Sequence, residues 1–154
     1  MMADDQLLNG DVGDDDVFVY TGGEQRVPDD VRRLRIAENV DTIPAGVCIE
    51  CRQLIEVEGH NNLKKIKEYA FSKCPSLRRL MKMTGLVEVE EGAFYNCNAL
   101  SELEFHKLEI IGHRAFSHCE SLGSINMPSI IRVGVYAFVR CPALTDVVFG
   151  QGLG

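Results

Sequence analysis

One motif recurs at an almost constant interval along this sequence and limits what the chain can fold into. Four segments share the pattern Ala-Phe-x-x-Cys-x-x-Leu, and a degenerate copy carries Val47-Cys48 in place of Ala-Phe. The copies lie 22 or 23 residues apart, as their last cysteines show: Cys51, Cys74, Cys97, Cys119 and Cys141. A unit of this length cannot bury its own apolar face, so successive units must stack and share one core. The period therefore predicts a solenoid.

The alternation of apolar residues places a strand in each unit. It is cleanest after the leucine of the motif, in Leu103–Phe105, Ile125–Met127 and Val147–Phe149. One strand per unit, always running the same way, gives a parallel sheet, and the crossover between parallel strands should be right-handed. The Ala-Phe-x-x-Cys segment is then a short helical or irregular turn on the opposite face. We expect a partial first repeat over residues 17–39, followed by five repeats.

These motifs resemble the BspA-type, or Treponema-type, leucine-rich repeat, in which Leu-x-x-Ile-x-Leu is often followed by Pro and later by Ala-Phe-x-x-Cys. The resemblance covers about residues 17–154, and Met127-Pro128 matches the proline position. It implies an α/β-class leucine-rich-repeat solenoid that acts as a non-enzymatic protein–protein interaction scaffold. Some bacterial members are cell-surface adhesins, so an adhesin fragment is the alternative. The resemblance brings no catalytic residue to this chain.

The two ends of the sequence differ from its body. Residues 1–16 hold six aspartates and no basic residue, a composition that predicts a disordered acidic tail. At the other end, no polar cap follows Phe149, although solenoids need one. The C-terminal cap is therefore expected to be missing. The last strand would then leave an open edge that can pair with a second copy.

Charge and hydropathy exclude several classes of protein. The net charge of −7 argues against a nucleic-acid or anionic-membrane surface, because both need a basic field. No apolar run approaches the ~18 residues of a membrane helix, and no secretory signal is visible at the start. We therefore expect a cytoplasmic protein that binds an unidentified protein partner.

Few residues suggest chemistry. The pair Cys48-x-x-Cys51 lacks the second pair of ligands that a zinc site needs and the βαβ context of a redox motif. His113 and His118 lie near Cys119, but that cysteine falls in the buried register, whereas a nucleophile needs exposure and an oriented base. The sequence therefore predicts no enzyme, cofactor or metal. A thiol-dependent or metal-dependent protein is the less favoured alternative.

Equivalent positions of stacked units should lie on top of one another. The phenylalanines of the motif are therefore predicted to form one buried spine: Phe71, Phe94, Phe116 and Phe138. The cysteines of the motif are predicted to be buried free thiols. Cys48, in the imperfect first repeat, is expected to be the most accessible of them.

Alternation also determines which side chains leave the core on the open face of the strands. The first row begins with four residues of alternating charge, the charge ladder: Arg33, Glu56, Arg79 and Glu102. In an in-register stack such neighbours lie about 4.8 Å apart. Each opposite pair contributes roughly 0.2–1 kcal/mol, so the ladder is interpreted as aligning the coils rather than capturing a ligand.

The next two rows supply the candidate partner-binding face, made of Glu58, His60, Met81, Met83, Glu104 and His106. The two methionines are predicted to be an adaptable apolar anchor. Between them, Lys82 falls at an inward position, where a charge is costly to bury. Two outcomes remain open. Either Lys82 escapes and both methionines stay on the open face, or the chain slips by one residue and turns them into the core.

Overall fold

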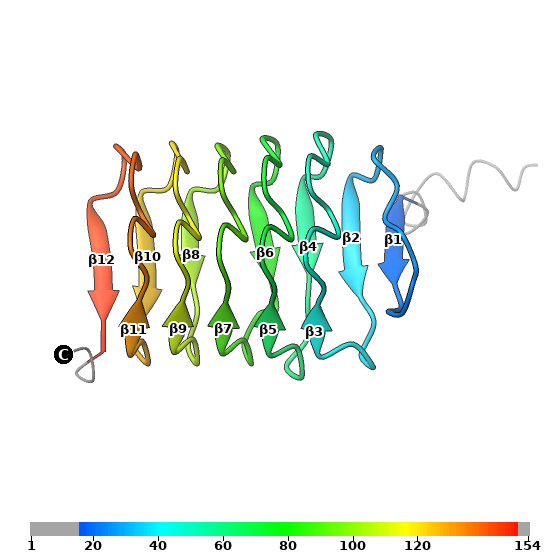
Figure 1. Ribbon diagram of the computed structural model, residues 1–154, viewed down its shortest axis with the longest axis horizontal. Helices are drawn as coiled ribbons and strands as arrows, with labels where there is room; N and C mark the ends of the chain where they lie inside the picture. The colour runs from blue at the N-terminus through cyan, green and yellow to red at the C-terminus, as the bar shows by residue number, and fades with distance from the viewer. Residues whose placement is uncertain (1–15, 151–154) are drawn as a thin grey trace, which may run out of the picture.

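The computed structural model describes residues 16–150, which form a row of stacked coils (Figure 1). Each full coil contributes two short strands, and none of the described residues lies in an α-helix. The strands are β1 Val17–Tyr20, β2 Arg33–Ile36, β3 Thr42–Ile43, β4 Glu56–Glu58, β5 Lys65–Ile66, β6 Arg79–Met81, β7 Glu88–Val89, β8 Glu102–Glu104, β9 Ile110–Ile111, β10 Ser124–Met127, β11 Arg132–Val133 and β12 Asp146–Phe149. The predicted solenoid of parallel strands is confirmed. The acidic tail lies outside the described residues apart from Asp16, and so does any continuation after Gly150.

The strands form two faces of the coil. The strands predicted after each motif make the open-face sheet, which is divided into two parts with the orders β1-β2-β4-β6 and β8-β10-β12. The second sheet, β3-β5-β7-β9-β11, is continuous and was not anticipated from the sequence. Its strands have only two residues each, too few for a visible alternation pattern. All pairings are parallel and in the predicted register, with Arg33 opposite Glu56 and Glu56 opposite Arg79.

The core contains the predicted aromatic spine. Ring centroids of successive phenylalanines are 5.4, 5.3 and 5.5 Å apart along Phe71, Phe94, Phe116 and Phe138, and the rings lie within 10° of parallel. The first three side chains are fully buried, whereas Phe138 is only partly buried. The spine therefore carries its full packing energy in the middle of the stack and less in its last coil.

The turns that carry the phenylalanines, called arcs here, hold the coils together through their backbone. In each full coil but the last, three alternate N–H groups of the arc donate to carbonyls of the next arc at 2.7–3.0 Å. This one-way arrangement needs a left-handed backbone at two positions per arc, such as Tyr69 (φ 56°) and Lys73 (φ 61°). That conformation costs a non-glycine residue roughly 1–2 kcal/mol. The hydrogen bonds between coils offset that cost.

The open-face sheet is interrupted because of Lys82. This residue adopts a left-handed backbone (φ 60°) and leaves the core, while Met83 turns inward and is 4% exposed. Neither predicted outcome is right as a whole, since Lys82 escapes and one methionine still enters the core. Strand β6 ends at Met81 and does not pair with β8, although the second sheet continues past this point. Figure 1 shows β6 and β8 standing farther apart than the other neighbours of this sheet.

The spine can be tested by truncating one ring at its centre and one at its end. Phe94→Ala should lower the free energy of unfolding by roughly 3–5 kcal/mol, because the removed ring leaves a cavity in a fully buried site. Phe138→Ala should cost clearly less, since its ring is only partly buried. Urea unfolding of the two variants and the wild type measures both. Equal losses would contradict the gradient in burial along the spine.

Candidate functional site

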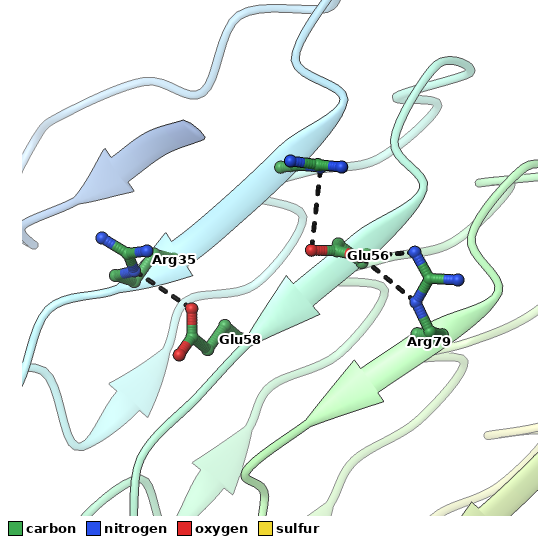
Figure 2. Close-up of polar contacts among 5 residues, drawn as sticks. Arg35, Glu56, Glu58 and Arg79 are labelled. Carbon is green, nitrogen blue, oxygen red and sulfur yellow. Dashed lines mark hydrogen bonds and ion pairs between the residues drawn. The ribbon is translucent and has the colours of Figure 1, made fainter. Parts of the chain in front are cut away.

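The charge ladder forms across three strands of the open-face sheet (Figure 2). Arg33 Nε lies 3.8 Å from Glu56 Oε2, and Arg79 Nη2 lies 2.6 Å from Glu56 Oε1. The fourth predicted member, Glu102, stands on β8 beyond the interruption, and no residue in the described range forms an ion pair with it. The ladder therefore ends at Arg79. The arginines are about half exposed, so each pair contributes only about 0.2–1 kcal/mol.

Glu58, in the second row, is held on both oxygens. Arg35 Nε lies 3.1 Å from Oε1, and Lys82 Nζ lies 2.6 Å from Oε2. The hydrogen bond from Lys82, followed by the one from Arg35, lowers the pKa of Glu58. The escape of Lys82 from the core thus places its charge beside a carboxylate. Glu58 has little remaining capacity to bind a partner.

Two residues assigned to the partner-binding face are buried, so the prediction of their exposure is wrong. His60 is 8% exposed, and its Nε2 lies 3.0 Å from both the Ala37 and Val40 carbonyl oxygens. Its Nδ1 accepts a hydrogen bond from the Asn62 N–H at 3.1 Å, which assigns the ring proton to Nε2. The ring therefore ties two loops together. Met83 lies inside the core because Lys82 has a left-handed backbone conformation, which changes the side to which the next side chain points.

The remaining predicted residues lie on the two sides of the interruption. Met81 is partly buried at the end of β6, opposite Glu58 in register. Glu104, at the end of β8, is exposed, and His106 Nε2 lies 3.7 Å from its Oε2. A protonated His106 would pair with this carboxylate. The structure therefore does not gather the six predicted residues into one patch.

A groove of about 580 Å³ lies along the interruption and over the last strands of the open-face sheet. Leu103 and Ile125 contribute apolar lining, and the carboxylates of Glu102, Glu104 and Asp146 line the groove. Lys82 also lines it, with its ammonium group paired with Glu58. Asn126 also lines it: its Nδ2 donates to Glu104 Oε2 at 3.4 Å, while its buried Oδ1 has no partner among residues 16–150. We name this the acidic groove.

Ser124, Asn126 and Asp146 were not predicted from the sequence as parts of a site. The available signal was the change in charge along the first row, which reads Arg, Glu, Arg and then Glu, Ser, Asp from strand to strand. Basic residues stop at the interruption, so the carboxylates beyond it have no neighbouring cation on the next strand. That contrast was visible in the sequence, but the opening of the sheet was not.

The cysteines of the repeat have a structural role that the register alone did not reveal. Four of these thiols lie within hydrogen-bond distance of the backbone carbonyl at the phenylalanine position of the preceding coil. The Sγ–O distances are 3.1 Å for Cys74 to Cys48, 3.1 Å for Cys97 to Phe71, 3.3 Å for Cys119 to Phe94 and 3.1 Å for Cys141 to Phe116. A cysteine fits this position because it is small and apolar yet carries a weak donor.

The thiols are free, as predicted, and the pKa is raised for five of them, whereas the hydrogen bond with Cys48 lowers the pKa of Cys51. Burial raises the pKa of Cys97 well above its usual value and raises the pKa of Cys119 to about 12. The expectation that Cys48 is the most accessible thiol is wrong, because it is fully buried, and its hydrogen bond to Cys51 together with burial raises its pKa. Cys141 is the most exposed of the six. Within residues 16–150, no group of three or more His, Cys, Asp or Glu side chains is arranged to hold a metal.

The coil of 22–23 residues, its parallel strands and its buried leucines define a leucine-rich-repeat solenoid. The chain belongs to the BspA-type leucine-rich repeat family, whose model matches residues 29–153 in six copies. No curated protein sequence matches the chain significantly.

Solved bacterial structures share this fold. A leucine-rich repeat protein of T. pallidum is 25% identical, with a TM-score of 0.72 over 87% of this chain and 64% of its own. The pneumococcal vaccine antigen PcpA is 19% identical, with a TM-score of 0.66 over 80% and 32%. A leucine-rich cell-surface protein of Faecalibacterium prausnitzii is 20% identical, with a TM-score of 0.63 over 88% and 48%. The chain thus spans less than two thirds of each of these proteins. Over residues 16–150 it has no helix that is long and apolar enough to span a membrane.

Thiol labelling of the native protein tests the burial of the repeat cysteines. Cys141 should react first with a maleimide, because its side chain is partly exposed, whereas Cys74, Cys97 and Cys119 should react only as the protein unfolds. Mass spectrometry of the digested protein assigns each label, and labelling in urea, where all six should react, is the control. Native labelling of Cys97 as fast as Cys141 would show that the core is open.

Proposed function

We propose that the protein is a non-enzymatic scaffold that binds a protein partner on its open face, in the acidic groove. The observation that carries this proposal is the contrast between the two halves of the open-face sheet. Before the interruption, Glu56 and Glu58 are paired with arginine or lysine. After it, Glu102 and Asp146 have no cationic partner among the described residues.

This contrast favours a partner segment that carries lysine or arginine. Unpaired carboxylates around one groove attract such a segment and speed its encounter, and they disfavour acidic partners. The buried Oδ1 of Asn126 is an additional acceptor for a donor of the partner, provided that the side chain turns toward the groove.

The backbone beside the groove offers a second means of recognition. The edges of β6 and β8 that face the interruption are not paired with each other. An extended segment of a partner can add to such an edge through main-chain hydrogen bonds, while its side chains reach neighbouring pockets. This mode supports the binding of a flexible segment rather than a rigid surface.

A binding role also agrees with the raised pKa values of the buried cysteines of the repeat. A nucleophilic thiol needs a lowered pKa and access to substrate. Burial instead raises the pKa of Cys74 to about 12, and the same holds for Cys119. These thiols stay protonated at neutral pH, which supports a non-enzymatic scaffold.

A cell-surface adhesin is the second candidate, favoured by the structural similarity to the cell-surface protein of F. prausnitzii. The first candidate places the scaffold in the cytoplasm. Fractionation of source cells with surface proteolysis distinguishes the two, because a surface protein is digested in intact cells and a cytoplasmic one is protected. Both candidates use the same groove.

Self-association through the last described strand is a further proposal. Val148 and Phe149 of β12 are about half exposed, and one edge of this strand pairs with no described strand. Such an edge can template pairing with a second copy. Sedimentation at rising concentration should then show dimers or larger species, and a clean monomer would count against this contact.

Charge reversal in the groove tests the main proposal. The partner is first captured with the wild-type chain and identified, and its affinity is then measured for a Glu102→Lys and Asp146→Lys double variant. We expect binding to weaken at least tenfold, because two attractions become repulsions at about 0.7 kcal/mol or more each. Weakening should diminish at high salt.

The control is Glu109→Lys, an exposed residue that does not line the groove. It changes the net charge in the same direction, by half as much as the double variant, and should leave the affinity within twofold of the wild type. Thermal unfolding checks that all variants are folded. Unchanged binding by the folded double variant would remove the groove from the proposed function.

A further inference from the structure

The first full arc exposes backbone groups that every later arc satisfies. The carbonyls of Glu68, Ala70 and Ser72 accept N–H groups of the preceding arc at 3.0, 2.8 and 2.8 Å. The equivalent carbonyls of the next three arcs are bonded in the same way, at 2.7–3.0 Å. In the first arc, the corresponding oxygens belong to Ala45, Val47 and Ile49, and none of them accepts a backbone hydrogen bond from a described residue. Three parallel acceptors therefore lack a backbone partner among residues 16–150.

These carbonyls open into a cavity. In the later arcs the same groups point toward the preceding coil, and here that place is taken by the loop that follows β1. The loop and the first arc border a cavity of about 290 Å³ that is open to solvent, lined by Gly23–Val27 and Asp29 on one side and by Pro44–Val47 and Ile49 on the other. This size is near the lower end for small-molecule pockets, about 300 Å³. The cavity thus stands where the arc of the partial first repeat would otherwise lie.

Tyr20 lies at the same cavity. It is at the end of β1, is 1% exposed and lines the cavity, and its hydroxyl forms no hydrogen bond with a described residue. The hydroxyl is not among the fully buried polar atoms that lack a partner, so it is open to solvent. The hydroxyl and the carbonyls are therefore polar groups that a ligand in the cavity can reach.

The groups that line the cavity favour a ligand that carries a positive charge and hydrogen-bond donors. Acceptors predominate, because three carbonyl oxygens and the carboxylates of Glu24 and Asp29 are opposed by a single cation, Arg26. A primary ammonium group supplies three N–H donors, no acceptor and one positive charge. Carbonyls at alternate residues lie at most about 7 Å apart, so a short diamine can reach two of them.

We propose that this cavity binds primary alkylammonium groups through the free carbonyls of the first arc. The carboxylates supply the countercharge, and the Tyr20 hydroxyl accepts a further N–H. Two other occupants fit less well. The acidic segment 1–16 carries six aspartates, which the acceptors and carboxylates repel. The arc of a second copy is too large for a cavity of this volume that is walled by the loop.

The test follows carbonyl ¹³C resonances of the full chain during titration with 1,4-diaminobutane. The resonances of Ala45, Val47 and Ile49 should shift as their oxygens accept N–H groups. Those of Glu68, Ala70 and Ser72 should not, because they are already bonded, and they serve as the matched control. The proposal fails if the first three resonances stay in place, or if they already lie at bonded positions in the free protein.

Two comparisons define the ligand. Tetramethylammonium has the charge without N–H donors and should bind at least tenfold more weakly; equal binding would overturn the proposal. A peptide with one lysine distinguishes a partner's side chain from a free amine, since both carry the same ammonium group. Binding of either one supports the site, and failure of both refutes it.

Variants of the lining complete the test. Glu24→Gln with Asp29→Asn should weaken diaminobutane binding at least tenfold, and Tyr20→Phe should weaken it severalfold without a change in fold. Glu120→Gln, an exposed residue of a distant coil, should have no effect. If Glu120→Gln weakens binding as much as the double variant, the effect is one of overall charge and the site is wrong. The outcome is independent of the acidic groove, which lies elsewhere in the stack.

Discussion

The one-way hydrogen bonds between successive arcs are the constraint on which the rest of the structure depends. Each arc directs its N–H groups to the next coil and its carbonyls to the previous one. This direction requires left-handed residues at two positions, and it stacks the phenylalanines in contact 5.3–5.5 Å apart. The repeat thiols then reach the carbonyls of the preceding coil. A coil removed from the stack would lose all these contacts together, which explains why a single repeat cannot fold alone.

Because all these hydrogen bonds run in the same direction, the two ends of the stack differ. Interior arcs satisfy one another, but the first arc presents acceptors and the last described arc, around Phe138, presents donors. A side chain cannot alter this arrangement, since it belongs to the backbone. Any molecule that covers the first arc must therefore bring donors. The free carbonyls of Ala45, Val47 and Ile49 follow from the geometry of the repeat rather than from their own side chains.

One charged residue organises the open face. At the position of Lys82, other coils bury Ile36, Phe105 or Met127. Burying the ammonium group would cost several kcal/mol. The backbone instead adopts a left-handed conformation at Lys82. This conformation places the lysine beside Glu58 and turns Met83 inward. The sheet divides at this place while the second sheet and the aromatic spine continue, so the opening is confined to one face. The acidic groove exists because Lys82 interrupts the open-face sheet in one coil, while the other contacts between coils are kept.

By itself, the sequence determined the repeat period, the parallel strands, their register and the buried phenylalanine spine, because these follow from apolar residues in equivalent positions. It also predicted correctly that Arg33, Glu56 and Arg79 would be neighbours. Only the tertiary structure decided the fate of His60, whose burial depends on two carbonyls about 20 residues away. The same is true of Lys82, since the sequence left two conformations open and the balance of ion pairing, backbone strain and packing selected a third. Patterns of side chains indicate which residues share a face. Every residue has a backbone carbonyl, however, so only the assembled stack shows which carbonyls lack a partner among the described residues.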